Sequence, residues 1–468
     1  MVEATGERVN IALVIAIVAV ATIGGLLFGY DSGAVNGTQE GLKSAFGLSE
    51  AGLGFTVGSL LIGCFVGAFL AGKLADAMGR RKVMMLAAVL FLVGAIIQGF
   101  SHVQALFVIA RFMGGMAVGA ASVLSPAYIS EVAPANIRGR MTTVQQIMII
   151  TGLTVAFVVN YYLAAAAGSS TAIWWGGYEA WRWMYWMQAI PAAVFLVALL
   201  FIPESPRYLV QKGRLDEARI VLTRLFGPAA AAVKIRDIEA SFSKDHKPAL
   251  RDIMDPVKGG IRPIVWAGLV LAVFQQLVGI NVIFYYGATL WQAAGFSEAE
   301  ALQQNIFSGA ISIVACFLTV GLVDKIGRKP LLLIGSAGMA LTLFVMVYAF
   351  STGTVQGATL LLPGNMGQVA VGAALAYSAF FNISWGPVMW VMLGEMFPNQ
   401  MRGSALAVCG FAQWFANYVV TQSFPVMLGT IGLAASYSFY AVCAAISFFL
   451  VQKFIHETKG KELEDMQG

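Results

Sequence analysis

The stretch DAMGRRK at residues 76–82 occurs a second time as DKIGRK at residues 324–329, 248 positions further along the chain. A second signature repeats in the same order, because EVAPANIRG at 131–139 returns as EMFPNQMRG at 395–403 with identical Glu-x-x-Pro-x-x-x-Arg-Gly spacing. One basic turn of this kind is common at a helix end, but two signatures repeated in order are not a chance pattern. The repetition predicts a chain built from two related halves.

Long apolar segments flank these signatures. The 468 residues are 59% hydrophobic and 11% charged, whereas soluble domains carry roughly 25% charged residues. A membrane-spanning helix needs about 20 mostly apolar residues. The predicted spans are 11–35, 52–75, 83–100, 105–129, 141–164, 182–202, 263–289, 303–323, 330–350, 368–392, 404–427 and 432–454.

The spans predict an all-α integral membrane protein with twelve transmembrane helices, in two pseudo-symmetric six-helix halves around a central cavity. The expected organisation is a first half at 1–202, a linker at 203–262, a second half at 263–455 and a short tail at 456–468. Apolar positions at helical spacing within the linker predict two amphipathic helices, at 215–226 and 229–242.

Lysine and arginine set the expected orientation. The connections after the second, fourth, eighth and tenth spans hold nine basic residues, whereas those after the first, third, seventh, ninth and eleventh hold only Lys43. Basic connections stay in the cytoplasm. We therefore expect both termini, the linker and all the signatures on the cytoplasmic side.

The acidic and basic members of the signatures predict a cytoplasmic charge network. We expect them to pair when the cytoplasmic ends of the two halves close, and to be hydrated separately when those ends part. Each exposed pair stabilises little, which suits an interface that opens repeatedly. The predicted network comprises Arg81, Glu131, Arg138, Glu204, Arg328, Glu395, Arg402 and Glu457.

The signatures resemble those of the sugar porter family of the major facilitator superfamily. The likeness also includes PESPR at 203–207, FQQLVGIN at 274–281 and GGLLFGYD at 24–31, and it covers nearly the whole chain. The PESPR and QQ-x-x-GIN elements are particular to sugar porters. The resemblance implies the major facilitator fold and a monosaccharide substrate, and it is strongest to bacterial D-xylose and hexose–proton symporters.

A sugar has hydroxyls at its edge and an apolar face, so its site needs amides that both donate and accept, together with aromatic rings. A lone intramembrane amide is as well explained by helix–helix contact, but here many occur together. The resemblance implies sugar contacts for Gln146, Gln275, Gln276, Asn281, Trp390, Gln413 and Trp414. It implies a cavity or gate position for Phe28, Tyr285, Gly386, Leu153 and Ser312. Gly279 and the Gly386–Pro387 pair are expected to break their helices beside the ligand.

Two of these positions depart from the pattern of xylose symporters. Leu153 stands where they carry a second glutamine, seven residues after Gln146, and Ser312 stands where the family often has asparagine. Hexose carriers of the family often have an apolar residue at the first position. Glucose is therefore expected beside xylose as a candidate substrate.

Asp31 and Arg111 are ionisable residues inside predicted spans, which is costly and usually functional. Burial disfavours the charged carboxylate and a nearby guanidinium favours it, so a moving pair can take up and release a proton. The resemblance agrees, because proton-coupled sugar porters have aspartate at this position and facilitative relatives typically have asparagine. A purely structural ion pair is the alternative.

The leading hypothesis is import of xylose or glucose with a proton by alternating access. The alternatives are an uncoupled sugar uniporter and a transporter-like sugar sensor, although sensors usually carry a longer cytoplasmic tail. An enzyme is not expected, because the sequence has no Ser/His/Asp arrangement, phosphate-binding loop or metal-ligand spacing. We expect no metal, no cofactor and no nucleic acid, and a monomer in the inner membrane whose partners are a monosaccharide, a proton and the lipid bilayer.

Overall fold

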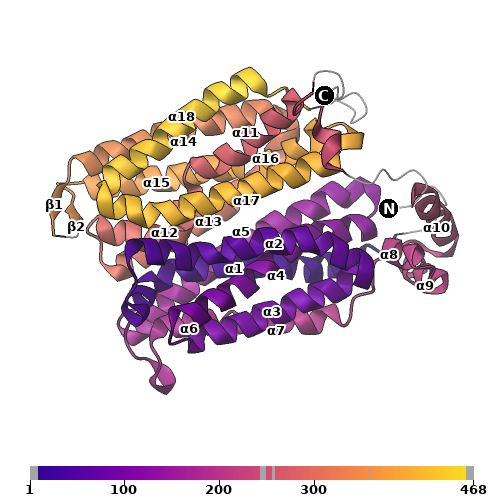
Figure 1. The fold of residues 1–468 in the computed structure, drawn as a ribbon, viewed down its shortest axis with the longest axis horizontal. Helices are drawn as coiled ribbons and strands as arrows, with labels where there is room; N and C mark the ends of the chain where they lie inside the picture. Colours follow the sequence, from indigo (N-terminus) through magenta and orange to yellow (C-terminus); the bar gives the residue numbers. More distant parts are fainter. Residues whose placement is uncertain (1–8, 243–248, 256–258, 358, 460–468) are drawn as a thin grey trace.

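The computed structural model describes residues 9–242, 249–255, 259–357 and 359–459. It is a helical bundle of two halves that lie one above the other in Figure 1. The first half consists of α1 (Ile11–Phe46), α2 (Glu50–Met78), α3 (Arg80–Phe100), α4 (Gln104–Val132), α5 (Ala135–Ala167), α6 (Ala180–Trp186) and α7 (Ala189–Leu199). The second half consists of α11 (Pro263–Leu277), α12 (Ile280–Ala293), α13 (Glu298–Ile326), α14 (Arg328–Ser351), α15 (Met366–Ile383), α16 (Trp385–Met396), α17 (Asn399–Thr430) and α18 (Gly432–Phe454).

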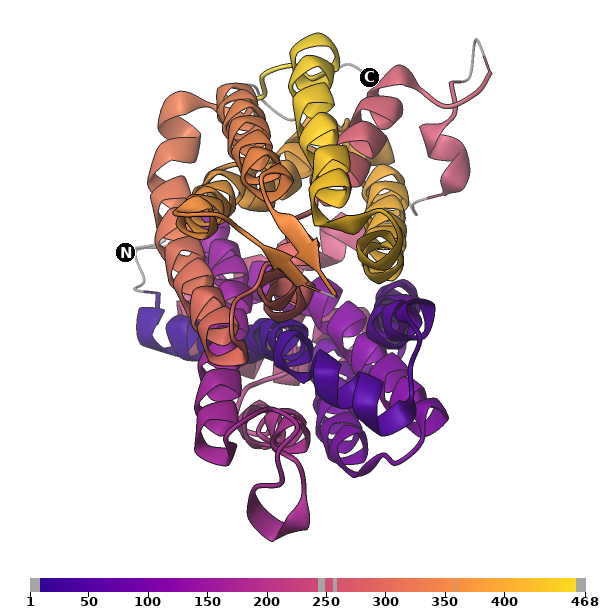
Figure 2. The same cartoon turned by 90° about the vertical axis from the view of Figure 1, so that its left-hand side faces the viewer.

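The two ends of the bundle carry different connections. One end, here the loop-helix end, carries α8 (Pro206–Gln211), α9 (Leu215–Phe226), α10 (Pro228–Phe242) and both described chain ends (Figure 1). The opposite end, here the hairpin end, carries the antiparallel strands β1 (Thr354–Gln356) and β2 (Thr359–Leu361), which lie over the second half in Figure 2. Short 3-10 turns, η1 (Trp175–Gly177) and η2 (Leu250–Ile253), complete the described connections. The amphipathic helices expected at 215–226 and 229–242 are confirmed as α9 and α10.

Eleven helical stretches of the described chain are long and apolar enough to cross a membrane. The remaining predicted span is α17, which has 32 residues and is less apolar because it carries Gln413, Asn417 and Gln422. The twelve predicted spans are therefore all helical. Close backbone contacts hold them together: a methyl group added at Gly115 of α4 would lie 1.9 Å from the Leu60 carbonyl oxygen of α2.

Three predicted spans are split into two helices each. The break between α11 and α12 falls at Gly279, as expected, where φ is +86° and a Cβ would lie 2.7 Å from the Tyr440 ring. The break between α15 and α16 falls at Ser384 instead of at Gly386–Pro387. Pro387 fits in the first turn of α16, where backbone N–H groups have no helical acceptor. The break between α6 and α7, near Gln188, was not predicted.

α1 is longer than its predicted span. It runs without a break for 36 residues, so Asp31 lies well inside it and 15 positions before its last residue, Phe46. The sequence places glycine, asparagine and glutamine after residue 35, which lowered the apparent apolar length. These polar side chains are buried in the bundle, because Asn36 is 1% exposed and Gln39 is 2% exposed.

Candidate functional site

Asp31 and Arg111 form an ion pair between α1 and α4. The Arg111 Nη1 atom donates to Asp31 Oδ2 over 3.0 Å, and both side chains are 1% exposed. Arg111 Nη2 also donates to the Val57 carbonyl over 3.4 Å. Asp31 Oδ1 and Arg111 Nε have no hydrogen-bond partner among the described residues. The pair is therefore deeply buried but incompletely hydrogen-bonded, which is costly for charged groups.

The amides of the second half form a connected group. Gln276 Nε2 and Gln413 Nε2 both donate to Gln275 Oε1 over 3.2 Å. Asn281 Nδ2 donates to Gln276 Oε1 over 2.5 Å and to Asn417 Oδ1 over 2.8 Å. The structure thus joins four of the predicted sugar residues, from α11, α12 and α17, with Asn417 as a fifth member.

The helix break in the predicted tenth span anchors this amide group. Gln275 Nε2 donates to the Trp385 carbonyl over 3.0 Å and to the Gly386 carbonyl over 3.3 Å. Asn417 Nδ2 donates to the Tyr285 hydroxyl over 3.5 Å. Gln413 Oε1 has no partner among the described residues although the side chain is buried. The group therefore keeps acceptor capacity that a ligand hydroxyl can use.

The two predicted tryptophans differ in how deeply they are buried. Trp414 is buried and lies against Phe28 of the first half, with ring centroids 5.8 Å apart. Trp390, on α16, is 39% exposed, and Gln146, on α5, is partly buried. Neither residue joins the hydrogen-bonded amide group in the described contacts. The Phe28–Trp414 contact is thus an aromatic link between the halves next to Gln413, and Phe65 of α2 makes another with Phe411 of α17.

The two residues that depart from the xylose pattern are both buried. Leu153 is 3% exposed, and its backbone lies against Gly29 and Gly33 of α1. Ser312 is fully buried, donates to the Ser308 carbonyl and accepts from Asn382 Nδ2 over 2.9 Å. Ser312 therefore contacts α15 in this conformation.

The charged signatures form two networks, each within one half. In the first, Arg80 pairs with Glu131 at 3.1 Å, and Glu204 accepts from the Arg81 backbone N–H over 3.1 Å. The Arg81 guanidinium donates to the Ile202 carbonyl. Glu131 thus pairs with Arg80 of its own half. The reason is local, because Glu131 in the last turn of α4 and Glu395 near the end of α16 each lie beside the basic turn of the same half. Pairing across the halves when the cytoplasmic ends close stays a prediction.

The second network has the same plan. Arg328 pairs with Glu395 through two hydrogen bonds of 2.9 and 2.8 Å. Glu457 accepts from the backbone N–H groups of Arg328 and Lys329 over 3.1 and 3.0 Å. Arg402 donates to the Phe397 carbonyl. The side chain of Arg138 lies outside the described residues.

The surroundings of Glu457 shift its protonation. Burial acts to raise the pKa of Glu457, but hydrogen bonds from backbone N–H groups outweigh burial and hold the pKa below its ordinary value. The donors are Lys459, Arg328, Lys329 and Thr458. The carboxylate is therefore the form that the second network stabilises.

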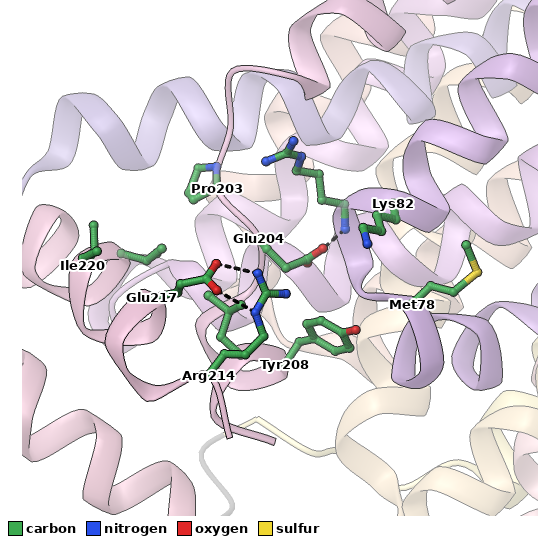
Figure 3. Close-up of a pocket in the computed structure, with 11 residues that line it drawn as sticks. Met78, Lys82, Pro203, Glu204, Tyr208, Arg214, Glu217 and Ile220 are labelled. Carbon is green, nitrogen blue, oxygen red and sulfur yellow. Dashed lines mark hydrogen bonds and ion pairs between the residues drawn. The ribbon is translucent and has the colours of Figure 1, made fainter. Parts of the chain in front are cut away.

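A cavity of about 370 Å³ lies beside the first network, between its basic turn and α8–α9 (Figure 3). Glu204 and Tyr208 face it, and Arg214 pairs with Glu217 across its edge through bonds of 2.7 and 2.5 Å. Tyr208 also donates to the Ala77 carbonyl over 3.2 Å, which holds α8 on the first half.

Comparison with known proteins gives the family. The family model for "Sugar (and other) transporter" matches residues 17–468. The chain belongs to this sugar transporter family. Its major facilitator fold and its membrane-transporter class are thereby shown, and an enzyme is excluded.

Relatives of this sugar transporter cover it almost end to end. It is 44% identical to a glucose transport protein of Synechocystis over 98% of this chain and 97% of that one. It is 38% identical to the D-xylose-proton symporter of Escherichia coli, over 98% and 96% of the two chains. The structure of the E. coli xylose transporter in a partially occluded inward open conformation matches with a TM-score of 0.82 at 37% identity, covering 96% of this chain and 100% of that one.

Three buried polar residues with partners near the candidate site were not predicted as site residues from the sequence of this sugar transporter. Asn417, which accepts from Asn281 and donates to Tyr285, was not predicted as a site residue. Gln188 is 1% exposed at the break between α6 and α7 and interacts with Asp31. Asn36 lies one and a half helical turns beyond Asp31. Each is an amide in a mostly apolar helix, and only the neighbouring helices reveal its partner.

Proposed function

We propose that this protein is a secondary active transporter that imports a monosaccharide together with a proton by alternating access. The Asp31–Arg111 pair carries the proposal, because two opposite charges at 3.0 Å and 1% exposure form a site that protonation changes strongly. The amide group of the second half, with Trp414 beside it, is the proposed sugar site. Gln146 and Trp390 are proposed to approach the sugar from α5 and α16 when the halves move.

The orientation follows from the basic connections. The loop-helix end is proposed to be cytoplasmic, with both termini there and the protein in the inner membrane as a monomer. The proposed domain division has halves at 1–202 and 263–455, a linker at 203–262 and a tail at 456–468. Charge networks confined to each half and the likeness to an inward open relative support an inward-facing conformation.

The proposed cycle begins when the hairpin end is open. A proton binds at Asp31, whose Oδ2 faces Arg111, and the neutral carboxyl releases Arg111. Sugar hydroxyls bind the amides, the halves rock, and sugar leaves at the loop-helix end. Asp31 then loses its proton and pairs with Arg111 again, as in this structure.

Glucose is proposed ahead of xylose. Leu153 removes a glutamine of the xylose pattern, and the glucose transport protein of Synechocystis is more similar to this chain than the xylose symporter is. A site built to bond a given hydroxyl discriminates strongly against a sugar that leaves its amides unpaired.

The test uses proteoliposomes with an imposed pH gradient and labelled glucose or xylose. We expect concentrative uptake and sugar-driven alkalinisation of the medium for the wild type. Asp31→Asn is expected to lose both and to keep exchange of labelled sugar. Asp216→Asn, which makes the same change at an exposed position of α9, is the matched control. Equal uptake with and without the gradient in the wild type would instead indicate a uniporter.

A further inference from the structure

Two buried amides of α1 lie at the hairpin end of the contact between the halves. Asn36 and Gln39 are one helical turn apart and are 1% and 2% exposed. Both side chains point at α12, which belongs to the other half. Alternating access requires this contact to break in every cycle, so its chemistry determines how readily the hairpin end opens.

Asn36 bonds the backbone of α12 on both sides. Its Nδ2 atom donates to the Phe284 carbonyl over 2.9 Å and to the Ile283 carbonyl over 3.3 Å. Its Oδ1 atom accepts from the Ala288 backbone N–H over 2.8 Å. In a regular helix the N–H of residue 288 bonds the carbonyl of residue 284. The Asn36 amide therefore bridges one donor and one acceptor that are natural partners of each other.

Gln39 repeats this arrangement one residue further along α12. Its Nε2 atom donates to the Tyr285 carbonyl, and its Oε1 atom accepts from the Thr289 hydroxyl over 2.5 Å. Residues 285 and 289 are again four apart. Two amides from one half thus bond polar groups of the other half between residues 283 and 289 of α12.

The surroundings are shaped to admit these amides. A Cβ at Gly287 would lie 2.3 Å from Asn305 Oδ1 and 3.0 Å from Asn36 Nδ2, so glycine leaves the space that they occupy. Asn305 of α13 donates to Asn36 Oδ1 over 2.9 Å and fixes the orientation of the amide. On another side of α12, Tyr286 donates to the Thr421 carbonyl over 2.8 Å, which holds the helix to α17 of its own half.

We propose that Asn36 and Gln39 are positioning residues that close the hairpin end by exchanging hydrogen bonds with α12. In the closed state the amides bond α12; on opening, the amides and the α12 groups that they bonded are hydrated instead. Few hydrogen bonds are lost in either direction, so the exchange sets the ratio of the two states without a large barrier. The inference rests on the proposed function only in that the hairpin end faces outward.

The test measures access from outside. Ser32 is 5% exposed, on α1 one turn nearer to the membrane centre than Asn36. A Ser32→Cys variant is labelled in intact cells with a membrane-impermeant maleimide, and the parent protein, whose four cysteines are buried, gives the background. Adding Asn36→Ala is expected to raise the labelling rate roughly five- to tenfold, about the factor of one net hydrogen bond.

Asn160→Ala is the matched control. Asn160 also donates to a backbone carbonyl of α1, that of Gly33 over 2.9 Å, but from α5 of the same half. We expect it to leave the labelling rate unchanged. Equal rates for the two alanine variants, or a folded Asn36→Ala protein with the parental rate, would overturn the proposal.

A second variant covers the case in which Asn36→Ala does not fold. Gln39→Ala is expected to raise labelling in the same direction, and no rise in a folded Gln39→Ala protein would also count against the exchange. The labelling assay needs neither sugar nor a proton gradient. Failure of coupled transport with a normal labelling shift would therefore remove the proposed function and leave the closing role intact.

Discussion

Arg111→Met removes the guanidinium and leaves the Asp31 carboxylate buried without its ionic partner. Asp31 is 1% exposed and Arg111 is its ion-pair partner at 3.0 Å, so solvent cannot replace the lost charge. Breaking a buried pair from one side costs about 3–5 kcal/mol. The carboxyl can limit this cost by taking up a proton. From an ordinary aspartate pKa of about 3.9, protonation at pH 7 costs about 4 kcal/mol.

The loss in free energy of unfolding is therefore expected to be about 4 kcal/mol at pH 7, and to shrink by about 1.4 kcal/mol for each pH unit below that. The sign follows because the folded variant holds a proton that the unfolded chain releases. The double variant Asp31→Asn with Arg111→Met has no charge to bury and should recover most of the loss.

Chemical unfolding in detergent micelles at pH 5.5, 6 and 7 measures these values, with counterflow of labelled sugar as the check on folding. We expect the single variant to lose proton-coupled uptake and the double variant to be more stable but equally uncoupled. A pH-independent loss, or equal stability of the single and double variants, would refute this account of the pair.

Three other outcomes are expected. Gly115→Ala should destabilise the protein by about 1–3 kcal/mol through its contact with Leu60, whereas Gly72→Ala, which meets no atom within 4 Å, should not; thermal unfolding compares them. Glu457→Gln should weaken the loss of stability in acid. Because folding lowers the pKa of Glu457, the carboxylate stabilises the protein fully above its ordinary pKa, and this stabilisation is lost as the pH falls through the lowered pKa. The free energy of unfolding, measured between pH 3 and 7, checks this. Gln275→Ala should raise the KM for sugar at least about tenfold, because the Trp385 carbonyl and the Gln413 amide each lose a hydrogen bond. Unchanged uptake kinetics would argue against the amide site.

The repeated signatures and the hydropathy of the chain predicted the twelve helical spans and the helix break at Gly279, since these depend on local properties. Gly279 has a φ of +86°, which favours glycine and interrupts the helical backbone, so this break depends on one residue. The break beside Gln188 was missed because its segment contains no such residue at that point. The buried Asp31–Arg111 ion pair was predicted because charged residues in apolar segments are rare.

The partners of the remaining polar residues depend on how helices pack. The sequence shows that Glu131 and Arg81 belong to one set of cytoplasmic signatures. Only the packing of α2, α3 and α4 shows that Glu131 forms its ion pair with Arg80. In the same way, Asn36 looks like an unremarkable polar residue beyond an apolar segment. Its role depends on α12, which lies almost 250 positions later in the chain.

α1 is unbroken for 36 residues, whereas α11–α12 and α15–α16 are interrupted beside the hydrogen-bonded amide group. On this one rod lie Phe28, which contacts Trp414, then Asp31, and then Asn36 and Gln39, all within about 17 Å at the helical rise. Because a continuous helix is stiff along its axis, a shift of α1 at the Phe28–Trp414 contact also shifts the Asp31 carboxylate and the amides of Asn36 and Gln39. In the proposed cycle this arrangement resists slippage, since a sugar that displaces α1 also displaces the proposed proton site and the proposed closing residues.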